Sequence, residues 1–264
     1  MGILHAIILG IVQGITELLP ISSSAHLILV KWLFDIEASK AFDVALHFGT
    51  LLAIGLFFFK DWLKLITAGI ANVKGKRSKE GFLFWYIVIA TIPGGLVGFL
   101  LEKFAGDFLE DKYLIIAIAL IVMGIVLYVV DKNFKPKTDY NHLTLKQTFI
   151  IGCSQALAFI PGVSRSGVTI TTGRYLGVDR ESAAKFSFML SAPIVLAATI
   201  FKLKDFVFNA QFIIGVLISF LVGIFVIKFL LDYLKKGSFK AFAIYRVIIR
   251  NSSNYNIFYK INNI

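Results

Sequence analysis

The chain has 264 residues, of which 58% are hydrophobic, and its mean hydropathy is +0.81. This apolar share exceeds that of an ordinary soluble domain, so the composition argues against a soluble globular protein. The formal net charge of +11 would suit a nucleic-acid-binding protein, but the basic residues cluster in connections between apolar stretches. We therefore expect no nucleic-acid partner. The single cysteine, Cys153, excludes an intrachain disulfide.

The first apolar segment is interrupted in its middle. Residues 3–19 and 25–34 are apolar, and the polar sequence 20–24, a proline with three serines, separates them. Proline and serine at this point favour a break followed by a new helix start. Gln13 and Glu17 within the first half, without a basic lead-in, argue against a cleavable signal peptide.

Five later stretches are long enough, or nearly so, to cross a bilayer as a helix. They are Val44–Phe59, Phe82–Leu101, Tyr113–Val130, Phe186–Phe201 and Phe212–Leu231. We therefore expect an integral membrane protein.

The charges between these spans predict how the chain crosses the membrane. Basic residues crowd the connections 60–81 and 131–148, and a third basic group that includes Arg246 follows the last span. Acidic residues predominate in the connection 102–112. Because Lys and Arg stay on the cytoplasmic side, segment 149–177 must leave that side and return to it. The sequence therefore predicts that 149–177 is re-entrant, dipping into the membrane and turning back.

The two interrupted segments form an internal repeat. Gly10–Gln13 followed by Pro20–Ser24 resembles Gly152–Gln155 followed by Pro161–Ser166. On the path set by the charges, the first loop enters from outside and the second from the cytoplasm. Such inverted repeats commonly place a site near the membrane midplane, between broken helices.

We therefore predict an all-α integral membrane protein with an inverted-topology repeat. It would contain two re-entrant helix–loop–helix segments and about five to six full transmembrane helices. The whole chain, 1–264, would form a single membrane domain. One repeat would cover about 1–130 and the other about 149–250, followed by an atypical polar tail, 251–264.

The residues of the two loops suit an anion. Serines would lie at the start of each second half-helix, where free N–H groups and the helix dipole attract negative charge. These serines are Ser22, Ser23, Ser24, Ser164 and Ser166. Arg165 adds a planar cation suited to phosphate oxygens. Capping alone would also explain the serines, but Arg165 lies too deep in the membrane to reach its surface easily.

Reactive side chains accompany the first loop. Gln13 and Glu17 are four residues apart and share a helix face, and Ser23 and His26 share a face of the next half-helix. A carboxylate, an imidazole and an arginine around an anion pocket suit phosphoryl hydrolysis. Glu17 could hold a divalent cation or act as a base, and His26 could act as nucleophile, base or acid. For His47 and Asp43, near the start of the next span, we expect a structural or lining role.

The segments Gln13–His26 and Pro161–Gly167 resemble the two signature motifs of the undecaprenyl-diphosphatase family, the bacitracin-resistance phosphatases. The resemblance extends over residues 1–249. It implies hydrolysis of undecaprenyl diphosphate to undecaprenyl phosphate, which recycles the lipid carrier of peptidoglycan synthesis. It also implies a requirement for Mg²⁺ or Ca²⁺ and an active site open to the outer face of the bacterial plasma membrane.

The resemblance also implies roles for individual residues. Glu17, Ser23, His26 and Arg165 match the essential positions, and Ser23 and His26 remain alternative nucleophiles. We expect Arg165, with the other loop serines and Gly167, to hold the diphosphate. Glu17 is the expected metal ligand and Gln13 a weaker one, because some members carry glutamate there. The expected partners are the lipid substrate and the membrane, and both a monomer and a homo-oligomer are compatible with the sequence.

The C-terminus departs from the family pattern, because the tail 251–264 is rich in asparagine where the family continues into an apolar span.

The repeat leaves other functions open. Inverted repeats around a midplane site are also typical of transporters, so a lipid-phosphate flippase would need a similar pocket. A non-catalytic lipid-binding protein would need the serines and Arg165 but not Glu17 and His26 together. Release of phosphate from a prenyl diphosphate would separate the enzyme from both alternatives.

Overall fold

The computed structural model describes residues 1–104 and 113–249, and the regular elements in these ranges are helices. Five of them are long and apolar enough to cross a membrane. They are α3 (Lys40–Phe57), α5 (Lys79–Phe104), α6 (Tyr113–Asn133), α9 (Arg180–Lys202) and α10 (Ala210–Leu234). These helices coincide with the five predicted spans, so the prediction of an all-α membrane protein is confirmed. The polar tail 251–264 and most of the acidic connection 102–112 lie outside the described residues.

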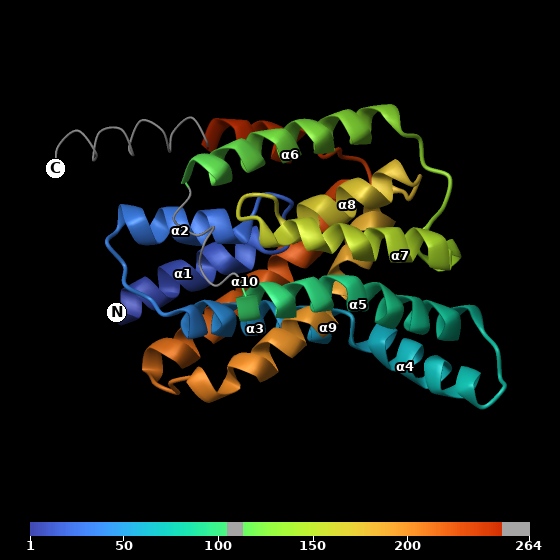
Figure 1. Ribbon diagram of the computed structural model, residues 1–264, viewed down its shortest axis with the longest axis horizontal. Coiled ribbons are helices and arrows are strands. Elements are labelled where there is room, and N and C mark those ends of the chain that lie inside the picture. Colours follow the sequence, from blue (N-terminus) through green and yellow to red (C-terminus); the bar gives the residue numbers. More distant parts are fainter. Residues whose placement is uncertain (105–112, 250–264) are drawn as a thin grey trace.

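Both predicted re-entrant segments are broken helices. The first consists of α1 (Ile3–Thr16) and α2 (Ser23–Leu33). The second consists of α7 (Leu145–Ser154), the short 3-10 helix η2 (Gln155–Phe159) and α8 (Arg165–Tyr175). In Figure 1, α1 runs inward from the end of the molecule that carries the N-terminus, and α2 returns to that end. The α7–α8 pair does the same from the opposite end. The predicted inverted topology is therefore confirmed.

The two repeats exchange packing partners. Helix α1 of the first repeat packs along α10 of the second, and α7 of the second packs along α5 of the first. Glycines permit both approaches: a Cβ on Gly10 would lie 2.8 Å from the carbonyl oxygen of Gly215, and one on Gly152 would lie 2.2 Å from that of Ala90. Each broken helix is thus held against a long helix of the other repeat.

The connection 60–81 is mostly helical, which its charge pattern did not indicate. Helix α4 (Phe59–Val73) is amphipathic, with Lys60 and Lys64 exposed and Leu65 and Gly69 buried. The ring of Phe84 in α5 lies against Gly69, where a Cβ would come within 2.3 Å of it. The two helices therefore form an antiparallel pair that projects from the bundle (Figure 1).

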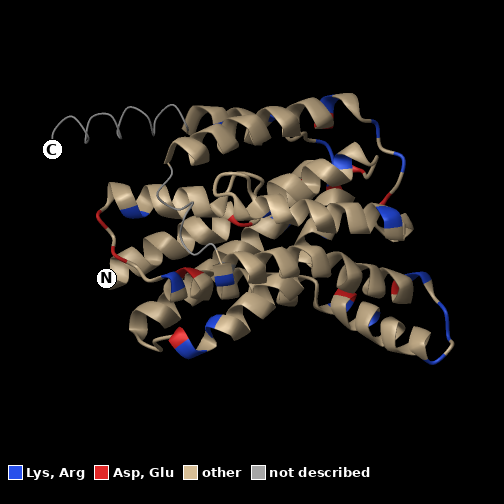
Figure 2. Ribbon diagram, in the orientation of Figure 1, with Lys and Arg blue, Asp and Glu red and all other residues tan. Residues whose placement is uncertain are grey.

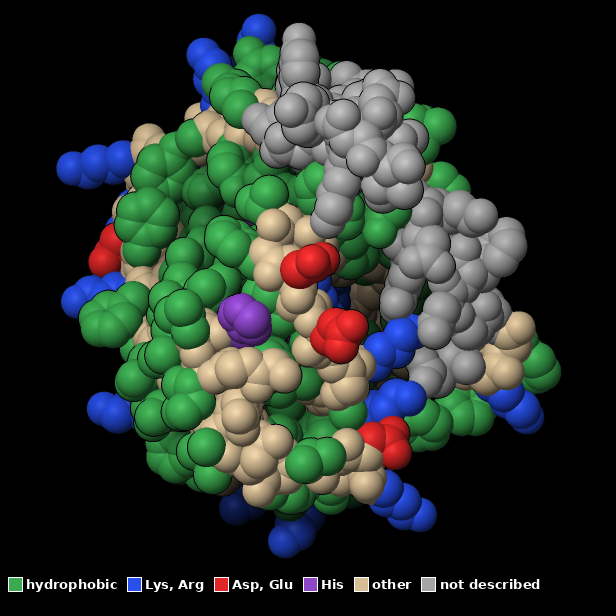
Figure 3. All heavy atoms as spheres, turned by 90° about the vertical axis from the view of Figure 1, so that its left-hand side faces the viewer, with side chains coloured by type: hydrophobic (Ala, Val, Ile, Leu, Met, Phe, Trp, Pro, Cys, Tyr) green, Lys and Arg blue, Asp and Glu red, His purple; other side chains and the backbone are tan. Residues whose placement is uncertain are grey.

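The distribution of charge distinguishes the two ends of the molecule. Lys and Arg gather at the end that carries the α4–α5 and α6–α7 connections (Figure 2). Figure 3 looks onto the opposite end, where hydrophobic side chains surround a few acidic and basic ones. This asymmetry agrees with a cytoplasmic location of the basic connections.

The close packing of α7 on α5 gives a first prediction. We expect Gly152→Ala to lower the free energy of unfolding by about 1–3 kcal/mol, because the added methyl group would overlap main-chain atoms of Ala90. The measurement is the melting temperature of the purified protein in detergent. Gly55→Ala in α3 is the matched control, since a Cβ there meets nothing within 4 Å. Equal melting temperatures for the two variants would contradict the packing.

Candidate active site

The breaks in the two re-entrant segments have the same backbone conformation. Ser22 and Ser164 are the N-caps of α2 and α8, with φ 77°, ψ 95° and φ 75°, ψ 120°. Each hydroxyl accepts a hydrogen bond from the N–H three residues later and lies within 3.3 Å of the serine hydroxyl two residues later. A positive φ is unusual for serine, so its occurrence at both equivalent positions confirms the repeat at the level of geometry.

A cavity of about 300 Å³ lies between the two breaks. Its polar wall is formed by residues of both loops and of α3: Glu17, Ser22, Ser23, Ser24, His47, Gln155, Ser164 and Arg165. Its apolar wall is formed by Val44, Ala158, Phe159, Ile194, Val195 and Ala198. A cavity with one polar and one apolar wall can hold a molecule with a charged head and a hydrocarbon chain.

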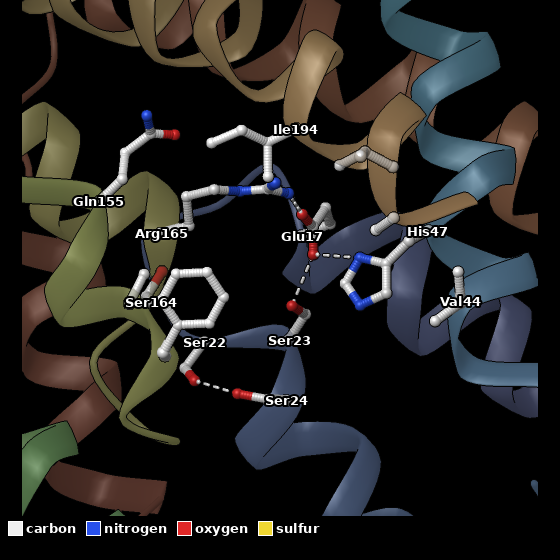
Figure 4. Close-up of a pocket in the computed structure, with 14 residues that line it drawn as sticks. Glu17, Ser22, Ser23, Ser24, Val44, His47, Gln155, Ser164, Arg165 and Ile194 are labelled. Atoms are coloured by element: carbon white, nitrogen blue, oxygen red, sulfur yellow. Dashed lines mark hydrogen bonds and ion pairs between the residues drawn. The ribbon is translucent and has the colours of Figure 1, made fainter. Parts of the chain in front are cut away.

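Glu17 is the centre of the polar wall (Figure 4). Its carboxylate pairs with the guanidinium of Arg165, and Ser23 Oγ donates to Glu17 Oε2 at 2.6 Å. Gln13 Nε2 donates to the same oxygen at 3.1 Å. His47 Nδ1 lies 3.1 Å from Glu17 Oε2 and 2.8 Å from Gln13 Nε2. The side chain of Glu17 is only 7% exposed, so these partners compensate a nearly buried charge.

Other predicted residues hold the loops together without lining the cavity. Ser166 Oγ donates across the break to the carbonyl oxygens of Glu17 and Leu19, at 3.2 and 3.1 Å. The N–H of Gly167 donates to Ser164 Oγ at 3.0 Å. The predicted lining role of His47 agrees with the structure. Asp43 pairs instead with Lys31 on α2.

His26 lies away from the cavity. The residue is 7% exposed, its Nδ1 is 2.7 Å from the carbonyl oxygen of Ser22, and its Nε2 is 2.8 Å from Tyr245 Oη. The two rings are also stacked, with centroids 5.6 Å apart. The structure therefore does not place His26 beside Glu17 and Ser23, where we expected it. Its spacing from Ser23 puts the two on one helix, but α2 directs the imidazole towards residues 240–249, which form a further helix.

Arg246, which the charge pattern had grouped with a cytoplasmic basic cluster, is fully buried beneath both breaks, with an exposed fraction of 0%. It donates to main-chain carbonyls of three separate segments: Pro20 at 3.1 Å, Gly162 at 2.6 Å, Val163 at 3.0 Å, Leu120 at 3.0 Å and Ala119 at 3.5 Å. The prediction that Arg246 belongs to the third basic group was wrong, because the apolar residues around Arg246 place this part of the chain in the core. A single guanidinium thus joins both broken loops and α6.

Two buried amides occupy equivalent places in the repeats. Gln155 corresponds to Gln13, and the Oε1 atom of each is buried without a hydrogen-bond partner in the described residues. Gln155 is 2% exposed, lines the cavity and donates to the carbonyl oxygen of Ala90 at 3.4 Å. A buried amide oxygen without a partner is costly, so Oε1 of Gln155 is suited to accept a hydrogen bond from a ligand or to bind a cation. Gln13 is 0% exposed and is not among the residues that line the cavity.

Comparisons with known proteins identify the family. The family model described as Bacitracin resistance protein BacA matches residues 6–250. A protein of Caldicellulosiruptor bescii is 49% identical over 251 residues, which are 93% of this chain and 94% of that protein. Proteins of Pelotomaculum thermopropionicum and Moorella thermoacetica are 49% and 46% identical over 94% of this chain and 94% and 95% of their own lengths. All three bear the name undecaprenyl-diphosphatase.

The chain belongs to the BacA family. The BacA match includes both broken loops, the cavity and the residues 240–249 that carry Tyr245 and Arg246. Gln155 could have been found from the repeat alone, because the comparison that aligned the serines also aligned it with Gln13. No local pattern singled out Arg246, whose partners are more than 80 residues away.

The position of Arg246 gives a second prediction. We expect Arg246→Gln to lower the free energy of unfolding by about 3 kcal/mol or more, because it leaves buried carbonyls of both loops unpaired. Arg246→Lys should be intermediate, because an ammonium group donates from one point rather than across a plane. Thermal unfolding in detergent measures both variants. Arg77→Gln, at an exposed arginine, is the control. Equal melting temperatures for Arg246→Gln and this control would contradict the role of Arg246 in joining the two loops.

Proposed function

We propose that this chain hydrolyses undecaprenyl diphosphate to undecaprenyl phosphate and inorganic phosphate. The product is the lipid carrier of peptidoglycan synthesis, and its recycling would give resistance to bacitracin. The names of the similar proteins support the substrate. The observation that carries the proposal is the hydrogen bond from Ser23 Oγ to Glu17 Oε2, 2.6 Å long, between two facing helix N-termini.

The diphosphate would bind between these helix N-termini. The starts of α2 and α8 offer N–H groups and the positive ends of two helix dipoles. Arg165 has five N–H donors, so it can hold phosphate oxygens while remaining beside Glu17. The serine hydroxyls on the cavity wall would donate to the remaining oxygens. The first isoprene units would lie against Phe159, Ile194 and Ala198.

Ser23 and Glu17 would supply the chemistry. Glu17 Oε2 takes the proton of Ser23 Oγ, which bonds to the terminal phosphorus while the bond from that phosphorus to the bridging oxygen breaks. Undecaprenyl phosphate leaves with the electron pair of that bond and takes the proton from Glu17. Water then attacks the phosphoserine and gives a proton to Glu17. Ser23 Oγ leaves phosphorus with the electron pair of its bond and takes that proton, which releases inorganic phosphate and restores the hydroxyl. Arg165 would stabilise the charge that develops on the transferred group.

His26 is the weaker candidate for the nucleophile, because both of its ring nitrogens have partners and it does not line the cavity. Through the carbonyl of Ser22 it would instead fix the start of α2, and hence the position of Ser23.

A divalent cation fits this site only when the substrate completes its coordination. Among the described residues, no group of three or more His, Cys, Asp or Glu could hold a metal ion. Mg²⁺, however, is often bound by one or two carboxylates together with substrate phosphates. Glu17, the C-cap of α1, would hold it, and Gln13 would add its Oε1 once its amide rotates, because its Nε2 now faces Glu17. When bound, the cation would neutralise charge on the diphosphate.

We also propose that the site opens towards the outer face of the bacterial plasma membrane. The cavity is lined by Val44 and His47 in the first half of α3 and by Ala198 near the end of α9. These parts of both helices lie towards the end with the N-terminus, opposite the basic connections (Figures 1 and 2).

Hydrolysis by the purified protein tests the proposal. We expect phosphate release from a long-chain prenyl diphosphate, and a decrease in kcat of about 10²–10⁴-fold for Glu17→Gln, which removes the base. Ser23→Ala should lower kcat at least as much. Ser39→Ala, at the distant N-cap of α3, is the matched serine control. Transport of the lipid into liposomes without phosphate release would favour a flippase. Absence of both activities would favour a lipid-binding protein without catalytic function.

The proposed cation gives a further prediction. We expect a chelator to abolish hydrolysis and added Mg²⁺ or Ca²⁺ to restore it. Gln13→Glu should lower the cation concentration that gives half-maximal activity, because it adds a second carboxylate beside Glu17. A cation dependence unchanged by Gln13→Glu and by Gln13→Ala would exclude Gln13 as a ligand.

A further inference from the structure

A second cavity lies at the basic end of the molecule, at the opposite end of α8 from the candidate active site. Its volume is about 360 Å³, and it is bounded by the ends of α6 and α8, the start of α9 and the end of α10. Its basic lining residues are Lys132, Lys135, Arg174, Arg180 and Lys235, against three acidic ones, Asp131, Asp179 and Glu181. The excess of positive charge suits an anion.

Part of this charge is compensated internally. The buried carboxylate of Asp131 accepts from Arg174 Nε at 3.0 Å, from Arg180 Nε at 2.8 Å and from the N–H of Phe239 at 3.1 Å. Asp179 caps α9 through the N–H of Ser182. With Asp131 and Asp179 engaged and Lys235 paired with Asp232, the positive surplus rests on Lys132, Lys135 and the outward half of the Arg180 guanidinium, whose side chain is partly exposed. Glu181 is the remaining acidic residue of the lining.

An apolar groove of about 280 Å³ lies along the same helix, α6. It lies between α6 and the helix 240–249, and its lining is almost entirely hydrocarbon, including Gly124, Ile125, Ala243, Ile244 and Val247. One face of α6 contributes to both cavities. Ile125 and Tyr128 line the groove, and Lys132 and Lys135 line the basic cavity. The first three of these residues are three or four positions apart, so they lie in one row along the helix, and Lys135 follows its end. The Lys132 ammonium lies 5.8 Å from the centre of the Tyr128 ring, so a residue that lines the basic cavity neighbours one that lines the groove.

We propose that these cavities together bind one anionic phospholipid of the cytoplasmic leaflet. The headgroup phosphate lies among Lys132, Lys135 and Arg180, and an acyl chain lies in the groove beside Ile125. Basic pockets between membrane helices on the cytoplasmic side recognise such headgroups. The exposed ring pair of Phe134 and Tyr175, with centroids 4.8 Å apart, lies beside the basic cavity, where aromatic residues mark the membrane–water interface.

This lipid would stabilise α8 without entering the candidate active site. Arg174 lies in the last turn of α8, and Arg165 is the first residue of the same helix. Besides Asp131, Arg174 donates to the carbonyl oxygens of Val178 and Phe134, at 2.6 and 2.9 Å. A headgroup held by neighbouring cations would reinforce this cluster and so stabilise the cytoplasmic end of α8.

Lipid titration of the purified full chain in detergent tests the proposal. Phosphatidylglycerol should raise the melting temperature and should be retained in native mass spectra at least about tenfold more tightly than phosphatidylcholine. The double variant Lys132→Gln, Lys135→Gln should weaken phosphatidylglycerol binding about tenfold or more. The control Lys74→Gln, Lys76→Gln removes the same charge from the exposed α4–α5 connection and should bind like the parent chain.

An uncharged variant keeps the test decisive if the double variant is unstable. Ile125→Ser should weaken long-chain phosphatidylglycerol more than a short-chain form, because it makes the groove polar. Stabilisation by inorganic phosphate equal to that by phosphatidylglycerol would mean a simple anion site and overturn the proposal. Equal binding of phosphatidylcholine, or equal losses in the double variant and its control, would also overturn it.

Discussion

The architecture depends on satisfying two interrupted backbones at membrane depth. A broken helix exposes carbonyl groups that lipid cannot hydrogen-bond, so the protein itself must supply the donors. Arg246 does so for both breaks, through the carbonyls of Pro20, Gly162 and Val163. A planar guanidinium with five donors can reach several segments at once, and no other side chain carries as many donors. Burying the charge of Arg246 costs free energy, and the surrounding carbonyl dipoles offset that cost.

The repeat makes a symmetric backbone and an asymmetric site. Ser22 and Ser164 have matching conformations, and the residue after each contacts Glu17. In the first repeat that residue is Ser23, a hydroxyl that can react; in the second it is Arg165, a cation that can bind. Only the first repeat has the carboxylate, because Phe159 occupies the position that corresponds to Glu17. In the proposed mechanism, these differences between equivalent positions assign reaction to one loop and anion binding to the other.

The features that could be predicted from the sequence are those with a local signature. Hydrophobic length located the spans, the Lys and Arg distribution oriented them, and the proline–serine breaks located both loops. The opposed repeats placed Glu17 and Arg165 at one pocket, whereas their direct ion pair was not predicted. The partnership of His26 with Tyr245, and of Arg246 with both loops, could not be predicted, because each joins segments over 80 residues apart. Helix α4 was missed because its Lys and Asp residues hid an amphipathic period.

The helix 240–249 has a consequence for how the protein is made. It carries two adjacent residues, Tyr245, which meets α2 through His26, and Arg246, which meets both breaks. Of the described elements, it is the last to leave the ribosome. Until it inserts, the carbonyls at the two breaks lack their shared donor, although every residue that lines the cavity has already been synthesised. The two breaks, and the cavity between them, can therefore take their final conformation only after the part of this helix that carries Arg246 has entered the membrane.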